Sequence, residues 1–265
     1  MDKSCVIVLP THSNYLGVCK NFVELLKKNW MDCPYELWIS YAGDRTNIEW
    51  AFNTIYNGKA ASLTECLYNL AEKVNADYYI SFLGDAFINS RIDSNFIIEL
   101  LKDIENNNIE YCSLMYVKNY YREKSFNEQF RYIHTTDRYS HNFVSFIASD
   151  GFIKSTLHTC NTDLEFEKHY LEVKEKKYYN SHIAIKKNYL GLVPAITNGK
   201  WNRLAYNKLV RDNPDISFDE REVETLAESL YQVFHDEFIW VIPSGLRVRV
   251  KKIMRLLGGR FATDL

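Results

Sequence analysis

Asp77-Tyr-Tyr-Ile-Ser-Phe-Leu-Gly-Asp-Ala-Phe-Ile-Asn-Ser-Arg-Ile-Asp93 is the stretch of sequence that decides the predicted fold. Residues 78–83 are a run of apolar and aromatic side chains, too short for a helix and too continuous for a strand with one wet face. They predict a strand buried on both faces of a sheet. The strand ends at Gly84, and Asp85 follows at once. Ligands of open α/β sheets bind beyond the carboxyl ends of the strands, which makes Asp85 a candidate binding residue, although Gly-Asp is also ordinary turn chemistry.

The composition is that of a globular protein with a real core. The 265 residues are 46% hydrophobic, which is enough for one large α/β domain or two small ones. Nineteen Tyr and fifteen Phe, with ten Gly and five Pro, argue against disorder and provide flat surfaces suited to a ligand cleft. The six cysteines form no CxxC pair, which indicates reduced, buried thiols and favours the cytosol. No stretch approaches the ~20 apolar residues of a membrane span.

Charge is distributed unevenly along the chain. The formal net charge is −2, but residues 245–265 carry six basic residues and one acid, so the first 244 residues hold 26 basic and 33 acidic residues. An acidic body binds the phosphate backbone poorly, so no nucleic-acid partner is expected.

The segments before the central stretch fit an α/β pattern. Residues 5–9 predict a strand, residues 17–30 a helix and residues 35–41 a second strand, which together form a βαβ unit. Ser62-Leu-Thr-Glu65 is a capping-box pattern that opens the next helix. Both early strands end in polar turns, whose residues are expected at the same sheet edge as Asp85: Pro10, Thr11, His12 and Asp44.

The segments after the central stretch continue the alternation. Asp93 is a predicted N-cap of a further helix. The remaining elements are expected to be a strand at 110–117, a long, partly irregular excursion at 118–142, a strand at 143–148, a short helix capped by Asp150, a helix opening at 161–163, an edge strand at 178–185 and a polar loop at 197–203. Long excursions of this kind in compact domains are usually functional lids or disordered, and the aromatic content of this one argues for order.

With these residues in place, the chain resembles the GT-A glycosyltransferases of bacterial surface (capsule or lipopolysaccharide) polysaccharide synthesis. The resemblance covers about residues 5–205. Its motifs are Val8-Leu-Pro-Thr-His12, similar to the family's opening strand and nucleotide-contacting turn; Asp77 to Asp85, similar to the strand with its metal-binding DxD-type motif; Asp163-Leu-Glu-Phe-Glu167, similar to the acidic helix start that supplies the base in inverting members; and Gly199-Lys-Trp201, similar to a late Gly-Lys-Trp. Residues 83–87 hold one acid where the family usually shows two.

The resemblance implies a GT-A fold, an α/β protein with a Rossmann-like mixed central sheet flanked by helices. A diphosphate leaving group needs its developing charge neutralised by a divalent cation or by cationic side chains. We therefore predict Mn²⁺ or Mg²⁺ at Asp85, with His182 as a further ligand. Lys200 and Arg203 would help or replace the metal, unless they are simply solvated surface cations. The predicted donor site for a nucleotide-sugar is Pro10, Thr11, His12, Asp44, Gly84, Asp85, Lys200 and Arg203.

An inverting transfer also needs a carboxylate that accepts the proton of the acceptor hydroxyl. Glu165 and Glu167 are the candidates. On a helix they point about 200° apart, so they cannot both face one cleft. Glu167 is preferred because its place in the Glu-Phe-Glu string matches the family better, although the helix dipole alone favours acids near a helix N-terminus.

The C-terminal tail is predicted to be a unit of its own, with a GT-A domain at 1–243 and a C-terminal basic amphipathic helix in a tail at 244–265. From Leu246, apolar residues recur at i, i+4, i+7, i+8 and i+11, with basic residues on the other side. Such a helix lies on an anionic membrane surface, or it docks on the domain's own sheet or in a dimer. We expect a cytoplasmic protein, peripheral on the inner face of the membrane, that acts on a saccharide or lipid-linked acceptor.

Two other functions stay open. A nucleotidyltransferase on a related sheet would carry a Gly-rich, basic phosphate loop after the first strand, and residues 10–17 lack one. A non-catalytic sugar- or nucleotide-binding module is favoured by the missing second acid. The sequence has no Gly-x-Gly-x-x-Gly, no Walker A lysine and no HxxxH set, which argues against a dehydrogenase, a P-loop hydrolase and a dedicated zinc site.

Overall fold

The structure is a computed structural model, and it describes residues 4–51, 53–117, 123–137, 139–171, 173 and 175–230. The predicted tail at 244–265 and its basic amphipathic helix lie outside these residues, as does the boundary at 243. Within the described chain, no helix is long and apolar enough to span a membrane.

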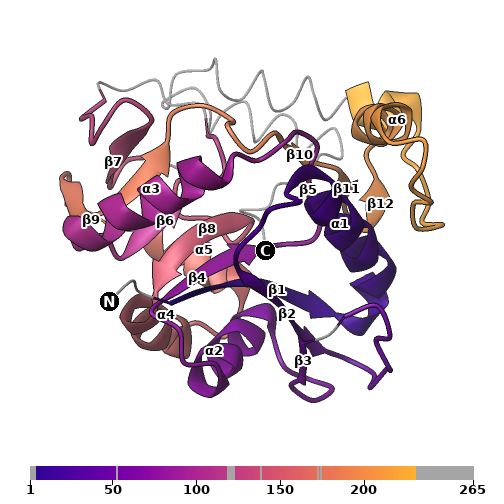
Figure 1. Cartoon of the computed structure of the whole chain (residues 1–265), viewed down its shortest axis with the longest axis horizontal. Coiled ribbons are helices and arrows are strands. Elements are labelled where there is room, and N and C mark those ends of the chain that lie inside the picture. The colour runs from indigo at the N-terminus through magenta and orange to yellow at the C-terminus, as the bar shows by residue number, and fades with distance from the viewer. Residues whose placement is uncertain are drawn as a thin grey trace, which may run out of the picture.

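A mixed central sheet organises the described residues (Figure 1). Its strand order is β3-β2-β1-β4-β8-β6-β9-β7, and the four strands from β3 to β4 run parallel. β8 enters antiparallel to both β4 and β6. The strands are β1 (Cys5–His12), β2 (Glu36–Ala42), β3 (Asn53–Tyr56), β4 (Tyr78–Phe82), β6 (Tyr111–Ser113), β7 (Phe130–His134), β8 (Ser145–Ser149) and β9 (Tyr178–Ile185).

Helices cover both faces of this sheet. Two short antiparallel pairs form separate two-stranded sheets: β5 (Ala86–Ile88) with β10 (Leu192–Pro194), and β11 (Ile196–Thr197) with β12 (Lys200–Trp201). The helices are α1 (Leu16–Asn29), α2 (Leu63–Lys73), α3 (Ser94–Asn106), α4 (Asp150–Thr156), α5 (Asp163–Leu171) and α6 (Arg203–Asp212), with 3₁₀ turns η1 (Ser13–Tyr15) and η2 (Leu157–Thr159). The predicted fold class, an α/β protein with a Rossmann-like, GT-A-type mixed sheet flanked by helices, is confirmed.

β4 is the central strand, and each of its five residues is buried. Its side chains alternate between two apolar clusters. Ile80 and Phe82 join the cluster formed with α1 and α3, whereas Tyr79 joins the cluster formed with α2, α4 and α5. A strand covered by helices on both faces has no wet face, which is why residues 78–83 read as one continuous apolar run.

Local sequence signals were reliable for several elements. The helix predicted at 17–30 is α1, and the capping box before α2 is present, since Ser62 and Glu65 satisfy each other's backbone N–H groups. Asp93 caps α3 as predicted. The strand at 178–185 is β9, but it is not an edge strand, because β7 pairs with its outer side.

The excursion predicted at 118–142 is not irregular throughout. It contains β7, the edge strand of the central sheet. Arg131 of β7 is buried and forms an ion pair with the equally buried Asp137, which also accepts a hydrogen bond from His134 N at 2.9 Å. Arg131 donates a further bond to Ser140 Oγ at 3.3 Å. The ion pair therefore holds the segment after β7 against the sheet.

Replacing Asp137 by Asn removes the buried counter-ion of Arg131 and leaves only the partly exposed Glu123, whose Oε1 lies 3.8 Å from Arg131 Nε, as its acidic partner among the described residues. We expect the free energy of unfolding, measured by urea denaturation, to fall by about 3 kcal/mol, because removing one partner of a buried pair strands the other charge. The matched control is Lys177→Gln, which breaks a pair with Glu175 whose side chains are 54% and 67% exposed. Lys177→Gln should change the free energy of unfolding by no more than about 0.5 kcal/mol. Equal losses in the two variants would show that the buried pair contributes no more than an exposed one.

Candidate functional site

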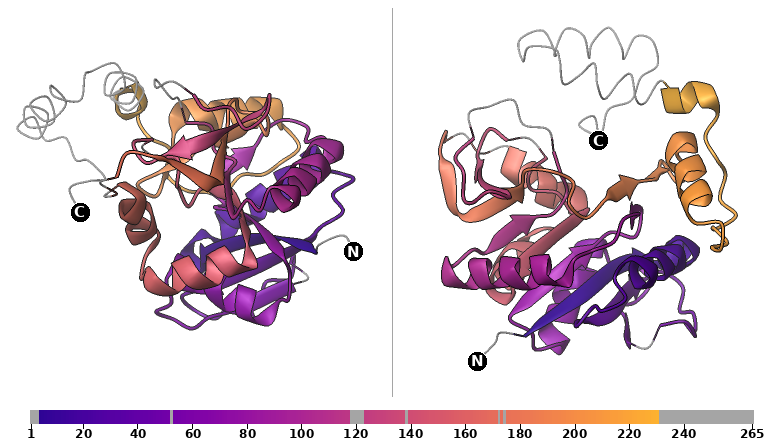
Figure 2. Two further views of the ribbon diagram at one scale, coloured as in Figure 1. Left: turned by 90° about the vertical axis from the view of Figure 1, so that its left-hand side faces the viewer. Right: turned by 45° about the horizontal axis from the view of Figure 1, so that its top comes forward.

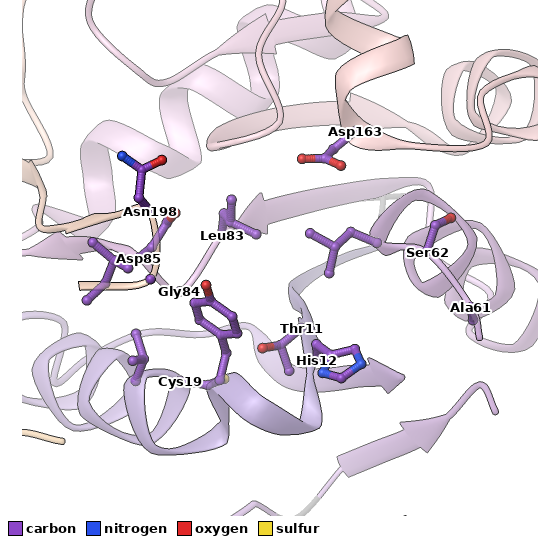
Figure 3. A pocket seen from close by; sticks show the side chains of 15 residues that line it. Thr11, His12, Cys19, Ala61, Ser62, Leu83, Gly84, Asp85, Asp163 and Asn198 are labelled. Atoms are coloured by element: carbon purple, nitrogen blue, oxygen red, sulfur yellow. The ribbon is translucent and has the colours of Figure 1, made fainter. Parts of the chain in front are cut away.

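A cleft of about 520 Å³ lies beyond the carboxyl ends of β1 and β4 (Figure 3). Its volume is in the range of small-molecule sites. Five parts of the chain line it, namely the end of β1 with the start of α1, the start of α2, the residues after β4, the start of α5 and the β11–β12 hairpin. The residues are Thr11, His12, Tyr15, Val18, Cys19, Ala61, Ser62, Leu63, Leu83, Gly84, Asp85, Asp163, Ile196, Asn198 and Gly199.

Asp85 lies in this cleft, as its place after a buried strand predicts. Its backbone is fixed, because Leu83 N donates to Val144 O at 2.7 Å and Asp85 O accepts from Ala195 N at 2.9 Å. Burial, with a smaller contribution from the charge of Asp163, raises the pKa of Asp85 to about 6. Gly84 packs against α1, since a Cβ atom there would lie 3.4 Å from Cys19 Cα.

Asp163 is the acid that the sequence reasoning did not select. It opens α5 and lies on the opposite side of the cleft from the β1 end, with its carboxylate in the space above Leu83 (Figure 3). Thr162 Oγ1 accepts the Glu165 N–H at 3.1 Å, which sets the start of the helix. The spacing of Asp163 from Glu167 could have identified it from the sequence. An acid four residues before Glu167 lies on the same helix face, one turn nearer the N-terminus.

The two predicted bases do not line the cleft. Glu165 is exposed and caps its own helix, with Oε2 accepting from Asn161 N at 2.7 Å. Glu167 lies one turn deeper than Asp163, and its Oε1 accepts from Phe143 N at 3.2 Å. Burial raises the pKa of Glu167, and the charge of Asp163 adds to the increase. Glu167 thus links α5 to the residues that precede β8.

The predicted donor residues at the ends of β1 and β2 divide into two groups. Thr11 and His12 line the cleft, whereas Pro10 is buried within β1. Asp44 is exposed outside the lining, where it pairs with Lys59 at 3.1 Å. Gly43 packs on the cleft residues, because its φ is +92° and a Cβ atom there would lie 2.6 Å from His12 Cε1.

Lys200 and Arg203 do not reach the cleft either. Lys200 Nζ pairs with Glu222 at 3.1 Å, and Arg203 Nε donates to Glu224 O at 2.7 Å. Arg203 also begins α6, so it is not in a loop. Among the described residues that line the cleft there is no Lys or Arg. The acidic sequence around 219–228 accounts for this, because it draws the nearby cations to itself.

Arg221 does not line the cleft, but it binds two parts of the chain that form the cleft wall. Its Nη1 donates to Gly199 O at 3.1 Å and its Nη2 to Asn14 O at 2.9 Å. The guanidinium carbon lies 4.4 Å from the centre of the Tyr15 ring, a cation–π distance. One side chain therefore joins the turn after β1 to the β11–β12 hairpin.

His182 does not lie near Asp85. Its register partner Tyr111 pairs with Ala148, which pairs with Tyr79 near the opposite end of β4. His182 instead bonds His141 at 2.9 Å within an aromatic cluster. Burial lowers its pKa to about 4. The structure therefore separates the two predicted metal ligands by the length of a strand.

The described residues contain no group of three or more His, Cys, Asp or Glu side chains that could hold a metal ion alone. Asp85 and Asp163 nevertheless offer carboxylate oxygens to one cleft. Mg²⁺ and similar ions keep water ligands and take others from substrate phosphates, so one or two carboxylates suffice. The residues fit an ion shared with a bound diphosphate, and they do not fit a metal centre made of protein ligands only.

No protein-family model matches this sequence, and no curated protein sequence matches it. Solved structures resemble the chain in overall fold. Staphylococcus aureus TarS matches with a TM-score of 0.43 and 11% identity over 92% of this chain and 46% of that structure, so the chain spans less than half of it. TarS 1–349 in complex with UDP-GlcNAc matches with a TM-score of 0.41 and 12% identity, over 92% of this chain and 77% of that structure. A cytidylyltransferase from Leptospira borgpetersenii serovar Hardjo-bovis matches with a TM-score of 0.46 and 11% identity, over 82% of this chain and 100% of that structure.

Asp85→Asn should stabilise the protein at neutral pH. The folded-state pKa of about 6 lies above the ordinary aspartate value of 3.8, so the folded state loses stability relative to the unfolded state as the pH rises from 4 to 6. Asn carries no such penalty. We expect the variant to gain up to about 3 kcal/mol in the free energy of unfolding at pH 7.5 and almost nothing at pH 3.5. The exposed Asp44→Asn is the control; a gain that is absent at pH 7.5, or equal at both pH values, would contradict the assignment.

Arg221→Ala should loosen the β11–β12 hairpin. We expect amide hydrogen exchange at residues 196–201 to accelerate by at least ~10-fold, because the variant loses hydrogen bonds to two backbone carbonyls. In Arg221→Lys, the exchange rate at these residues should be intermediate between those of Arg221→Ala and the natural protein. Arg211→Ala, which removes an exposed pair with Asp212, is the control and should leave this segment unchanged. Unaltered exchange in Arg221→Ala would show that the hairpin does not depend on the clamp.

Proposed function

We propose that the protein is a glycosyltransferase that moves a sugar from a nucleoside diphosphate-sugar donor to a saccharide or lipid-linked acceptor, with inversion. One observation carries the proposal. Two carboxylates, Asp85 after the central strand and Asp163 at the start of α5, face one cleft at the carboxyl edge of the sheet. An inverting transfer needs a base near the acceptor hydroxyl, and a second carboxylate can hold the cation that neutralises the leaving diphosphate.

Asp85 is proposed to serve the leaving group. The described lining carries two acids and no Lys or Arg, so a diphosphate would enter a repulsive field unless a cation accompanied it. Bound Mn²⁺ or Mg²⁺ would neutralise the charge that develops on the diphosphate. Asp85 would hold that ion together with the phosphates. The amino end of α2, at Ala61 to Leu63, adds a favourable dipole to the same cleft.

Asp163 is proposed as the base, in place of Glu167 and Glu165. It lines the cleft, where an acceptor hydroxyl can reach it, and the other two do not. Its carboxylate would take the hydroxyl proton as the new glycosidic bond forms and the bond to the diphosphate breaks. Glu167 supports this arrangement from one turn below, because its bond to Phe143 N holds the face of α5 that carries Asp163.

The nucleotidyltransferase alternative has less support from the cleft. Such an enzyme must stabilise a triphosphate, for which cationic groups after the first strand are expected. The described lining residues Thr11, His12 and Tyr15 after β1 include no Lys or Arg. A non-catalytic binding module would have no use for a second carboxylate at Asp163.

Thermal shift with nucleotides tests the proposal and separates the alternatives. The full chain is heated with nucleoside mono-, di- and triphosphates, each with and without Mn²⁺. A glycosyltransferase should be stabilised most by one nucleoside diphosphate and only when Mn²⁺ is present, because a ligand that binds only the folded state raises its stability. Preference for a triphosphate would favour the nucleotidyltransferase, and stabilisation by free sugars alone would favour a binding module.

Asp163→Asn should lower transfer by at least ~100-fold, because it removes the base from the chemical step. Mn²⁺-dependent nucleotide binding should stay within ~2-fold, since that step does not use a base. Glu165→Gln is the matched control on the same helix and should transfer at close to the natural rate. If Glu167→Gln abolished transfer while Asp163→Asn did not, the base would be Glu167.

A further inference from the structure

Two polar side chains of the cleft lining have no hydrogen-bond partner within the described chain. They are the amide of Asn198, at the tip of the β11–β12 hairpin, and the hydroxyl of Tyr15, in the turn after β1. The two lie on one wall, since Tyr15 Oη is 3.7 Å from the place that a Cβ atom on Gly199 would take. A few polar groups that converge on a cleft of this size are what fixes the orientation of a small ligand.

The backbone holds this wall in place without using either polar group. Asn198 and Gly199 have φ values of +50° and +81°, the left-handed conformation that both central residues of a type I′ hairpin turn adopt. Arg221 donates to Gly199 O at 3.1 Å, and its guanidinium covers a face of the Tyr15 ring. Figure 2 shows the orange segment that carries the hairpin leading from the sheet to α6. A ligand would therefore lose little free energy in ordering the groups that bind it.

The amide of Asn198 lies above the space between the two cleft acids. Figure 3 shows it above Asp85 and level with the carboxylate of Asp163, with Leu83 between them in the view. The hairpin is also tied to Asp85, because Ala195 N donates to Asp85 O at 2.9 Å. In the proposed transfer, the reacting carbon of the sugar must lie between the diphosphate near Asp85 and the acceptor hydroxyl near Asp163. The sugar ring that carries this carbon therefore lies beside Asn198.

The chemistry of this wall suits an uncharged sugar. An amide offers both a donor and an acceptor, and a phenol hydroxyl offers either, which matches neighbouring sugar hydroxyls. A sugar carboxylate would face Asp163 and find no Lys or Arg in the described lining. Arg221, the cation behind the wall, already bonds Gly199 O, Asn14 O and Asp219 Oδ1. A uronic acid would thus be repelled without a counter-ion to receive it.

We propose that Asn198 and Tyr15 bind hydroxyl groups of the transferred sugar, and that this sugar is an uncharged hexose or hexosamine derivative and not a uronic acid. The inference rests on the proposed function. A purely conformational role for Asn198 is the competing explanation, because Asn-Gly is a preferred sequence of this turn. Glycine adopts the same backbone conformation and lacks the amide, so Asn198→Gly separates the two roles.

Calorimetric titration of the full chain in the presence of Mn²⁺ tests the proposal. The probes are the nucleoside diphosphate that stabilises the protein most, its esters with uncharged sugars and its hexuronate ester. For uridine these are UDP, UDP-glucose, UDP-galactose, UDP-N-acetylglucosamine and UDP-glucuronate. We expect the best uncharged ester to bind at least ~10-fold tighter than the hexuronate, because like charges disfavour the latter.

Asn198→Gly and Tyr15→Phe should each weaken binding of that best ester by ~5-fold or more, as the loss of a hydrogen bond predicts. Binding of the free diphosphate should stay within ~2-fold. Asn108→Gly is the matched control, because Asn108 also has a left-handed backbone, with a φ of +51°, but lies in an exposed turn after α3 and outside the cleft lining. Circular dichroism melting establishes that each variant is folded.

The outcomes separate this inference from the proposed function. If no nucleoside diphosphate bound, the proposed function would fail and this inference with it. If the diphosphate bound but both variants kept the natural affinity for every ester, only the inference would fail, and Asn198 would serve the turn alone. Equal weakening of the ester and the free diphosphate would assign the two side chains to the nucleotide. A hexuronate ester that bound as tightly as the best uncharged ester would overturn the exclusion of uronic acids.

Discussion

The antiparallel pairing of β8 with β4 is the constraint on which the cleft depends. Because β8 runs against β4, its first residues lie beside the carboxyl end of β4, and Val144 O accepts from Leu83 N just before Asp85. The chain then returns through α4 along α2, where Thr64 Oγ1 donates to Cys160 O at 3.0 Å. That return delivers Asp163 to the edge where β4 ends. A parallel strand in this position would leave the chain at the same edge, with no return helix to present an acid there.

The described residues that line the cleft carry two acids and no Lys or Arg. Asp85 and Asp163 face one space, and burial and mutual repulsion raise the pKa of Asp85. In the free protein the raised pKa makes the ionised form of Asp85 costly. A buried acid of this kind is typical of a site where a bound ligand stabilises the ionised form. A divalent cation brought with a diphosphate would do so, since its positive charge would stabilise the ionised form of Asp85. Lys200 and Arg203, which were predicted to help or replace a metal at Asp85, do not line the cleft, so the proposed function relies on the metal ion for that charge.

Features that depend on neighbouring residues could be predicted from the sequence. The continuous apolar run of β4, the capping box of α2 and the acidic start of α5 are each set within a few positions, and all are present. Asp85 was found because a strand end fixes where its next residue lies. Asp163 was not predicted to line the cleft, although its spacing of four residues from Glu167 places both acids on one helix face.

Features that depend on distant partners could not be predicted in this way. β7 looked irregular because what orders it is a buried ion pair and its pairing with β9, neither visible in its own sequence. Lys200 and Arg203 looked available because Glu222 and the carbonyl of Glu224, which bind them, come later in the chain. The same late segment joins the cleft to the surface. Ala195 N donates to Asp85 O and Ala195 O accepts from Asn202 N, so one residue links the cleft acid to the cap of α6. The buried Trp201 ring stacks on Phe87 beside that link, with 5.2 Å between the ring centroids, so packing as well as hydrogen bonds joins the start of α6 to the cleft.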